Sequence, residues 1–137
     1  MPSIDYLDRV DLLEIGMSII SNFQVRDMGL LESAAARPQT TIFGKDAYET
    51  FEAKAAALLH ALARNHPLID GNKRLAWSAT RVFCLINGYD IRYSVVEAEL
   101  LVVGTAQGNF EVNEIVEFLH IYKVCITCSL VFEPDSR

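Results

Sequence analysis

The stretch from His66 to Arg74 constrains the fold most, because it joins two helical patterns through a turn. Pro67 disfavours helical backbone angles for His66, so we expect the preceding helix to end there. The pair Asp70-Gly71 is typical of a tight turn, in which a glycine lets the backbone approach a ligand closely. Apolar residues at helical spacing follow, which predicts a second helix whose first turn runs from Gly71 to Arg74 and directs its free amide groups at the turn.

Two cations, Lys73 and Arg74, stand side by side in this first helical turn. The helix dipole disfavours cations there by roughly 0.3 to 1 kcal/mol each, and a bound polyanion would remove that conflict. Backbone amides, an ammonium and a guanidinium on one turn suit the phosphates of a nucleotide. Asp70 is the candidate ligand of Mg²⁺, an ion that takes one or two carboxylates and completes its shell with phosphates and water.

The stretch resembles the signature of the Fic/Doc family, which reads His-x-Phe-x-Asp/Glu-Gly/Ala-Asn-Gly/Lys-Arg. The lysine at position 73 is typical of the death-on-curing (Doc) toxin branch. Leu68 replaces the usual phenylalanine with another apolar anchor. Trp77 stands where many Fic enzymes carry a second arginine, a difference that also favours the Doc branch. The resemblance extends from about residue 27 to about residue 122.

The resemblance implies an all-α fold, a single compact domain of about six helices with a small β-like flap. A length of 137 residues and 51% hydrophobic content suit one domain with a sizeable core, so residues 1–137 are assigned to a single domain. The tail over residues 123–137 matches the family poorly and is left unassigned. Its apolar, β-branched run fits a strand, a helix extension or an interface patch equally well.

Apolar periodicity and helix caps predict three helices before the motif. Asp27 caps a helix over residues 28–36 that Pro38 stops, and Asp46 caps the central, best-buried helix over residues 47–65. His60 lies on this central helix, where a lone histidine is more often structural or solvated than catalytic. The first helix spans residues 5–22, and five apolar residues form the stripe expected to face the core: Leu7, Val10, Leu13, Met17 and Ile20.

Three further helices are predicted from the motif onward. The motif helix ends at Asn87-Gly88, a good C-terminal stop. Ser94 and Glu97 form a capping box for a helix that runs to about Gln107. Asn113 caps the last helix, whose expected inward-facing residues are Ile115, Phe118, Leu119 and Tyr122.

Residues 39–44 break the helical pattern with β-favouring side chains, which predicts an extended loop or a small hairpin. In the family this segment is the flap that docks a target peptide by strand addition. The flap residues are then Thr40, Thr41, Ile42 and Phe43. The alternative is an ordinary connector in which Ile42 and Phe43 fill the core.

The resemblance implies transfer of a phosphoryl or nucleotidyl group from a nucleoside triphosphate to a protein hydroxyl. His66 is the expected general base, since an imidazole accepts protons near neutral pH. Asp70 holds Mg²⁺ against the phosphates. The residues that bind the phosphates and bear the charge of the transition state are Gly71, Asn72, Lys73 and Arg74. Each has a plainer reading as a helix-terminal, turn-forming or solvated residue, but those readings do not explain their convergence.

The Doc branch implies a toxin kinase of a toxin-antitoxin system, with ATP as donor and Mg²⁺ as cofactor. Its target would be a threonine of elongation factor Tu, so that translation stops, and a Phd-like antitoxin would neutralise it. Two alternatives stay open, a Fic-type AMP transferase and an inactive scaffold that binds an antitoxin. The scaffold reading requires an absent base or metal ligand, and His66 and Asp70 are both present.

A net charge of -6 argues against direct nucleic-acid binding, which needs an excess of Lys and Arg. The cations Arg64, Lys73, Arg74 and Arg81 form a local basic island that suits a small polyanion. The sequence contains no run of about 18 apolar residues, so no membrane-spanning helix is predicted. The N-terminal region is acidic, whereas a signal peptide begins with positive charge. A cytoplasmic protein is therefore expected.

The cysteines give little support for metal or redox chemistry. Cys84 lies inside an apolar helical pattern and reads as a core residue. Cys125 and Cys128 form a Cys-x-x-Cys pair, but zinc would need two more ligands and a redox motif would need a βαβ setting. The nearest match to the self-inhibitory helix of some Fic enzymes, Ser129 to Glu133, is followed by a proline. Inhibition is therefore expected from a separate protein.

Overall fold

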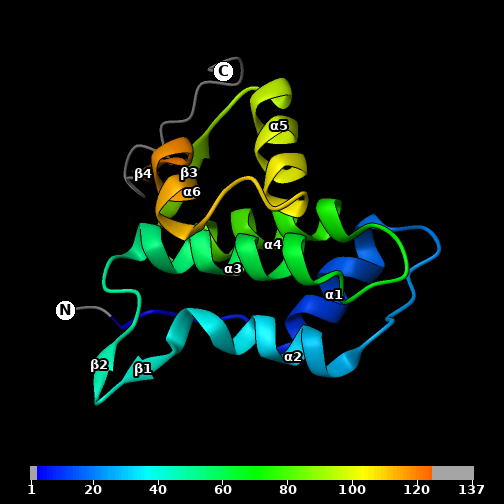
Figure 1. Cartoon of the computed structure of the whole chain (residues 1–137), viewed down its shortest axis with the longest axis horizontal. Helices are drawn as coiled ribbons and strands as arrows, with labels where there is room; N and C mark the ends of the chain where they lie inside the picture. Colours follow the sequence, from blue (N-terminus) through cyan, green and yellow to red (C-terminus); the bar gives the residue numbers. More distant parts are fainter. Residues whose placement is uncertain (1–2, 125–137) are drawn as a thin grey trace.

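Helix α3 (Phe51–Asn65) forms the centre of the computed structural model, which describes residues 3–124 (Figure 1). Every residue from Lys54 to Ala63 is buried, as expected for a helix that is apolar on nearly all sides. Helix α4 (Asn72–Ile86) runs back along it and makes its most extensive contact. The central position predicted for the helix before the motif, now α3, is confirmed.

The remaining helices cover the α3–α4 pair from two sides (Figure 1). Helices α1 (Arg9–Ile19) and α2 (Met28–Ala36), with the 3-10 turn η1 (Arg37–Gln39), lie on one side. Helices α5 (Val95–Ala106) and α6 (Val112–Phe118) lie on the other. Strands β1 (Thr41–Ile42) and β2 (Lys45–Asp46) form the predicted hairpin, and β3 (Tyr89–Arg92) pairs antiparallel with β4 (His120–Lys123). The all-α fold is confirmed.

Three predicted helix ends are confirmed by their contacts. The Asp27 carboxylate accepts a hydrogen bond from the amide of Leu30 at 3.1 Å and starts α2. Ser94 and Glu97 form the reciprocal capping box of α5. Asn87 is the C-cap of α4. These caps involve residues close in sequence, so the local pattern was sufficient to identify them.

The first helix is shorter than predicted and turned differently about its axis. It begins at Arg9 because the Asp8 carboxylate caps it, and it ends at Ile19. Leu12 and Gly16 face the core, whereas Val10 is 51% exposed and Met17 is 62% exposed. The predicted stripe is therefore wrong at those two positions.

The start of the central helix is also corrected. Thr50 caps α3, and its hydroxyl accepts a hydrogen bond from the amide of Ala53 at 3.0 Å. Asp46 instead ends strand β2, where its carboxylate accepts a hydrogen bond from the buried Lys54 ammonium at 3.1 Å. Ala47 consequently lies outside the helix. The carboxylate partners a buried cation, a tertiary contact that the cap prediction did not include.

The last helix and the second sheet differ from the prediction as well. Glu111 is the N-cap of α6, and Asn113 lies inside the helix. The four residues expected to face inward divide equally: Ile115 and Leu119 are buried, whereas Phe118 and Tyr122 are exposed. Tyr122 belongs to β4, because the chain leaves the helix after Phe118 and pairs with β3.

Burial raises the pKa of the Cys84 thiol to about 12, which agrees with its predicted place in the core. No helix within residues 3–124 is long and apolar enough to cross a membrane. The predictions for Cys125, Cys128 and most of the tail fall outside the described residues.

Candidate active site

The loop over residues 66–71 is held against the segment that precedes α2. Leu68 is 1% exposed and pairs with Val25 in an isolated antiparallel bridge. The carbonyl of Pro67 accepts hydrogen bonds from the amides of Arg26 and Asp27, at 2.8 and 3.0 Å. Leu68 thus anchors the loop in the apolar interior, the place expected of the residue that replaces phenylalanine in the motif.

The Arg26 guanidinium supports the end of α3. It donates to the carbonyl of His66 from Nε at 2.9 Å and from Nη2 at 2.6 Å, and to the carbonyl of Asn65 at 3.1 Å. These carbonyls lack helical partners because α3 ends there, with His66 in the left-handed region at φ 53°. Arg26 was missed in the sequence, because this contact joins segments 40 residues apart.

Asn72 fixes the shape of the loop from the other side. Its Oδ1 accepts a hydrogen bond from the amide of Leu68 at 2.8 Å, and its Nδ2 donates to the carbonyl of Leu68 at 3.0 Å. Both polar ends of the side chain are therefore engaged with the loop backbone. In this structure the Asn72 side chain positions the turn, whereas the sequence predicted that it would bind the phosphates.

Gly71 opens α4 and cannot be replaced without strain. Its φ is 89°, a conformation that favours glycine, and an added Cβ would lie 2.6 Å from Cδ1 of Ile20. The first intrahelical hydrogen bond runs from the amide of Leu75 to the carbonyl of Gly71 at 2.9 Å. The amides of the three residues between them have no helical acceptor, so they are available to an anion.

Four charged or titratable side chains of the motif are exposed: His66, Asp70, Lys73 and Arg74. Within residues 3–124, none of the four makes a hydrogen bond or ion pair through its side chain. Opposite charges gathered on one turn without pairing are expected where a ligand completes them.

A pocket of about 600 Å³ adjoins this turn. Asp70, Lys73 and Arg74 line it, together with Trp77, Tyr93 and apolar residues of α5. His66 is not part of the pocket wall, because it lies at the opposite end of the loop. The structure thus brings the predicted metal ligand and phosphate ligands together in one pocket wall, whereas the predicted base, His66, lies outside that wall.

The hairpin residues Thr40, Thr41, Ile42 and Phe43 are not close to this pocket. Figure 1 shows the hairpin near the N-terminal end of α3 and loop 66–71 at its C-terminal end. Helix α3, which has 15 residues and is therefore about 22 Å long, runs between these two ends. Ile42 is 57% exposed and Phe43 is 101% exposed, so the alternative that they fill the core is wrong.

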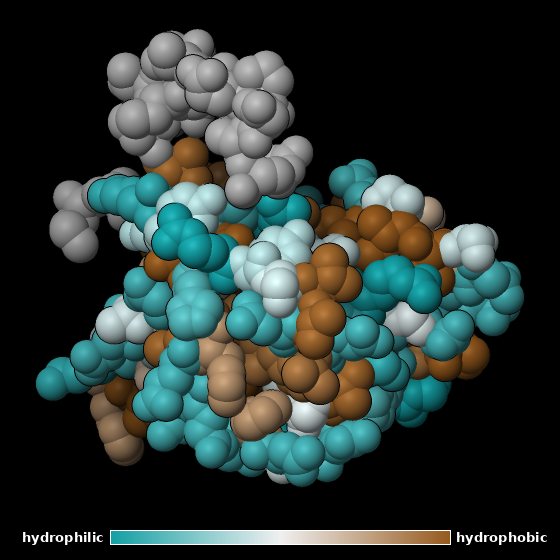
Figure 2. All heavy atoms as spheres, turned by 90° about the horizontal axis from the view of Figure 1, so that it is seen from above, coloured by the Kyte–Doolittle hydropathy of each residue, from teal (hydrophilic) through white to brown (hydrophobic). Residues whose placement is uncertain are grey.

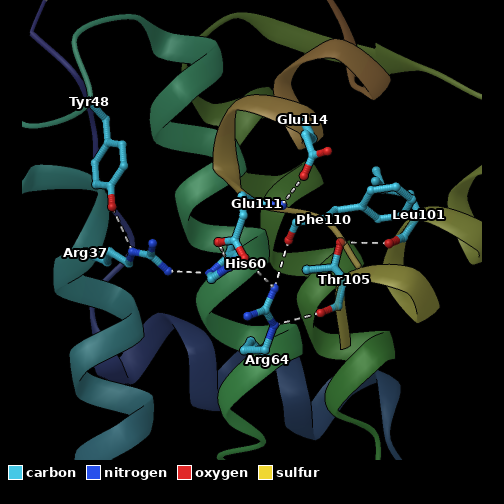
Figure 3. Close-up of polar contacts among 9 residues, drawn as sticks. All are labelled: Arg37, Tyr48, His60, Arg64, Leu101, Thr105, Phe110, Glu111 and Glu114. Carbon is cyan, nitrogen blue, oxygen red and sulfur yellow. Dashed lines mark hydrogen bonds and ion pairs between the residues drawn. The ribbon is translucent and has the colours of Figure 1, made fainter. Parts of the chain in front are cut away.

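Two cations of the predicted basic island serve other purposes. Arg64 donates to the carbonyls of Thr105 and Phe110, at 2.9 and 2.8 Å (Figure 3). Arg81 pairs with Asp90 at 3.0 Å, and this hydrogen bond raises the Arg81 pKa. Lys73 and Arg74 are therefore the members of the island that face the pocket.

His60 belongs to a separate polar cluster, defined by Arg37, His60, Arg64 and Glu111 (Figure 3). Nδ1 of His60 accepts from Arg37 at 2.7 Å, and Nε2 lies 3.3 Å from a Glu111 oxygen without hydrogen-bond geometry. Burial lowers the His60 pKa, and the charges of Arg37 and Arg64 lower it further. The expected structural role of this histidine agrees with these contacts.

The side chains around Asp70 determine which metal ion this carboxylate could hold. Within residues 3–124, no three His, Cys, Asp or Glu side chains gather into a metal site. A single exposed carboxylate beside an anion-binding turn fits Mg²⁺, because this ion takes few protein ligands and keeps waters and substrate phosphates. It does not fit a structural zinc site, which needs four protein ligands.

Comparison with known proteins identifies the family of the chain. The model of the Fic/DOC family matches residues 6–84, more than half of the chain and the whole of the motif. A protein of Mycolicibacterium smegmatis named Toxin Doc is 46% identical over 114 residues, which cover 81% of this chain and 88% of that protein. The chain belongs to the Fic/DOC family, and its candidate active site is the loop and first helical turn that carry the family motif.

Proposed function

We propose that this protein is a Doc-type toxin that transfers the γ-phosphate of ATP to a threonine or serine hydroxyl of a translation factor. By resemblance, the proposed target is elongation factor Tu, and we propose that the protein acts in the cytoplasm. One observation carries the proposal: Asp70, Lys73 and Arg74 surround the free amides of α4 and have no partners among the described residues. The similarity to a protein named Toxin Doc supports it.

Each residue of the motif has a separate proposed role in phosphate transfer. His66 takes the proton of the attacking hydroxyl, a contribution of about 10² to 10⁴ in rate for a placed general base. Lys73, Arg74 and the amides of the turn hold the phosphates and stabilise the charge that develops on them. Asp70 would hold Mg²⁺, which when bound neutralises phosphate charge. Arg26 and Asn72 keep the loop in shape through their contacts with its backbone.

Lys73 distinguishes the two transfer chemistries. A glycine at this place leaves room for backbone and phosphate to meet closely, whereas a lysine fills that space with a four-carbon stem and a positive charge. We infer that the α-phosphate cannot seat in the turn, so the nucleotide presents its γ-phosphate. Lys73→Gly should then lower γ transfer, and assays with ATP labelled at the α or the γ position will measure both activities. Undiminished γ transfer by the variant would show that Lys73 does not set the chemistry.

The product itself tests the proposed function. The full chain is incubated with elongation factor Tu, ATP and Mg²⁺, and the intact mass of the target is measured. A gain of about 80 Da indicates a phosphate and a gain of about 329 Da indicates AMP, because the two reactions attack different phosphorus atoms. An AMP adduct would show that the protein is an AMP transferase and not a kinase. An unmodified target would contradict both hypotheses for elongation factor Tu.

The apolar surface of α5 suggests how an antitoxin would act. Val95, Val96 and Leu100 are 76%, 65% and 66% exposed, and Val95 also lines the pocket. Figure 2, which views the molecule from the side of α5 and α6, shows apolar side chains at the surface of this face. An amphipathic helix of a Phd-like antitoxin lying along α5 would cover this surface and the pocket mouth together. Co-expression of such an antitoxin should restore growth, and persistent toxicity in a complex shown to form would refute this.

A further inference from the structure

The pocket beside the motif has a second part whose chemistry differs from that of the phosphate site. We infer that Trp77 and Tyr93 form the nucleobase subsite, so that the ligand is a nucleoside triphosphate held at both ends. This inference rests on the proposed function, because it assumes that phosphates bind at Lys73 and Arg74. It adds two residues outside the family motif that recognise the base.

The two aromatic rings form a corner in the pocket wall. Their centroids are 4.8 Å apart and their planes meet at 67°, an edge-to-face arrangement. Both rings line the pocket together with Val95 and Ala98 of α5. Flat aromatic rings and apolar side chains suit a planar base, because stacking on an aromatic ring is available to every base.

Tyr93 is held in place although it is 37% exposed. The Arg81 guanidinium lies over its ring at 5.5 Å and donates to its hydroxyl at 3.4 Å. Arg81 is itself fixed by Asp90, with hydrogen bonds of 3.0 and 3.3 Å to the carboxylate. An exposed tyrosine positioned in this way loses little conformational freedom when a ligand binds.

Charge sets the direction of the ligand in the pocket. At the turn, Lys73 and Arg74 line it together with Asp70, the carboxylate proposed to hold Mg²⁺, whereas Glu99 of α5 lines it with no cation on the same helix. A triphosphate is therefore attracted to the turn and repelled from α5. Trp77 follows Lys73 by four residues, about 6 Å along the helix axis, so the ribose would span the distance between the phosphates and the aromatic corner.

The single tryptophan of the chain makes the inference directly measurable. ATP, GTP and inorganic triphosphate, each with Mg²⁺, are titrated into the full chain while tryptophan emission is recorded. Free N-acetyltryptophanamide corrects for absorption by the nucleotides. ATP or GTP should quench Trp77 by stacking, and triphosphate should bind without quenching.

Variants separate the base subsite from the phosphate site. Tyr93→Leu should raise the Kd of the nucleotide at least about fivefold and leave the Kd of triphosphate unchanged. Tyr122→Leu is the matched control, because Tyr122 is 39% exposed beneath Arg92 but lies on β4, away from the pocket wall. Trp77→Phe should retain most of the affinity, because it keeps an aromatic ring. Since this variant has no tryptophan and triphosphate is not expected to quench, these Kd values are measured by isothermal titration calorimetry.

Two results would overturn the inference in different ways. If nucleotide and triphosphate bind equally and Tyr93→Leu changes neither, the aromatic corner does not hold a base, although the phosphate site stands. If neither ligand binds to the wild type, the proposed function fails together with the base subsite.

Discussion

Two histidines of α3, one within the helix and one at its end, differ in their exposure and in their polar contacts. His60 lies within α3, is 8% exposed, and accepts a hydrogen bond from Arg37 beside Glu111. His66 ends the same helix in the left-handed conformation, with an exposed imidazole and a carbonyl held by Arg26. The first is surrounded by charges that pair with one another. The second stands next to charges that have no partners in the described residues.

The difference separates stability from function. A buried polar group is costly unless it is paired, and the cluster around His60 pairs most of its groups within the protein: Arg37 donates to Nδ1 of His60, and Glu111 lies 3.5 Å from Arg64 and 3.3 Å from Nε2 of His60. Its surroundings disfavour the charged form of His60, because burial and two nearby arginines lower its pKa. The charges of the motif turn are exposed, so they can remain unpaired at little cost until a ligand arrives. Substitutions in the two regions should therefore affect different measurements.

The largest effect is expected at His66. His66→Ala should lower phosphate transfer by at least about 10² while leaving the free energy of unfolding nearly unchanged, because the imidazole makes no described contact. Transfer rates and urea unfolding are measured on the same preparations. His120→Ala is the matched control, an exposed histidine on β4. Wild-type turnover by the His66 variant would show that another residue is the base.

The opposite result is expected at Arg64. Arg64→Leu leaves the carbonyls of Thr105 and Phe110 without their donor and should reduce the free energy of unfolding by about 1 to 3 kcal/mol. Nucleotide binding by the folded fraction should be unchanged. The control is Arg9→Ala, which removes an exposed ion pair with Glu32 worth about 0 to 1 kcal/mol. Equal losses in the two variants would contradict the structural role of Arg64.

A smaller effect is expected for Asp70→Asn. The variant should need several-fold more Mg²⁺ for half-maximal transfer, because it loses one hard ligand from a shell that waters can partly complete. Mg²⁺ titrations of both proteins under saturating ATP provide the measurement. An unchanged midpoint would place the metal ligand at another residue.

The smallest effect concerns pH and His60. Its folded pKa lies below the ordinary value of 6.5, so the unfolded chain binds the proton more readily. The contribution of His60 to stability is then present above pH 6.5 and declines as the pH falls through that value toward the folded pKa. Urea unfolding of the wild type and of His60→Gln between pH 7.5 and about 5 should show a shallower pH dependence in the variant. Parallel curves would show that His60 is not responsible.

The sequence predicted what depends on neighbouring residues and missed what depends on distant ones. The caps at Asp27 and Ser94 were found because each involves contacts within three residues. Asp46 was misassigned as a cap because it is engaged by Lys54 in the folded protein. Pairing between β3 and β4 joins segments far apart in the chain, so no local pattern indicated it.

The same limit applied to the active site. One short stretch of sequence predicted the turn at Gly71, the charges beside it and the anchor at Leu68. The clamp by Arg26 and the aromatic partner Tyr93 come from other parts of the chain. The length of α3 also explains why the hairpin, one of the two alternatives predicted for residues 39–44, does not lie beside the loop.

One NMR titration compares the two regions most directly, because His60, His66 and His120 are the three histidines of the chain. The imidazole resonances, assigned with single substitutions, are followed as ATP and Mg²⁺ are added to the full chain. The resonances of His66 should move with the occupancy of the motif turn, while those of His60 and His120 stay in place. Shifts at His60 with none at His66 would contradict the central claim that the ligand completes the unpaired charges of loop 66–71 and the first turn of α4.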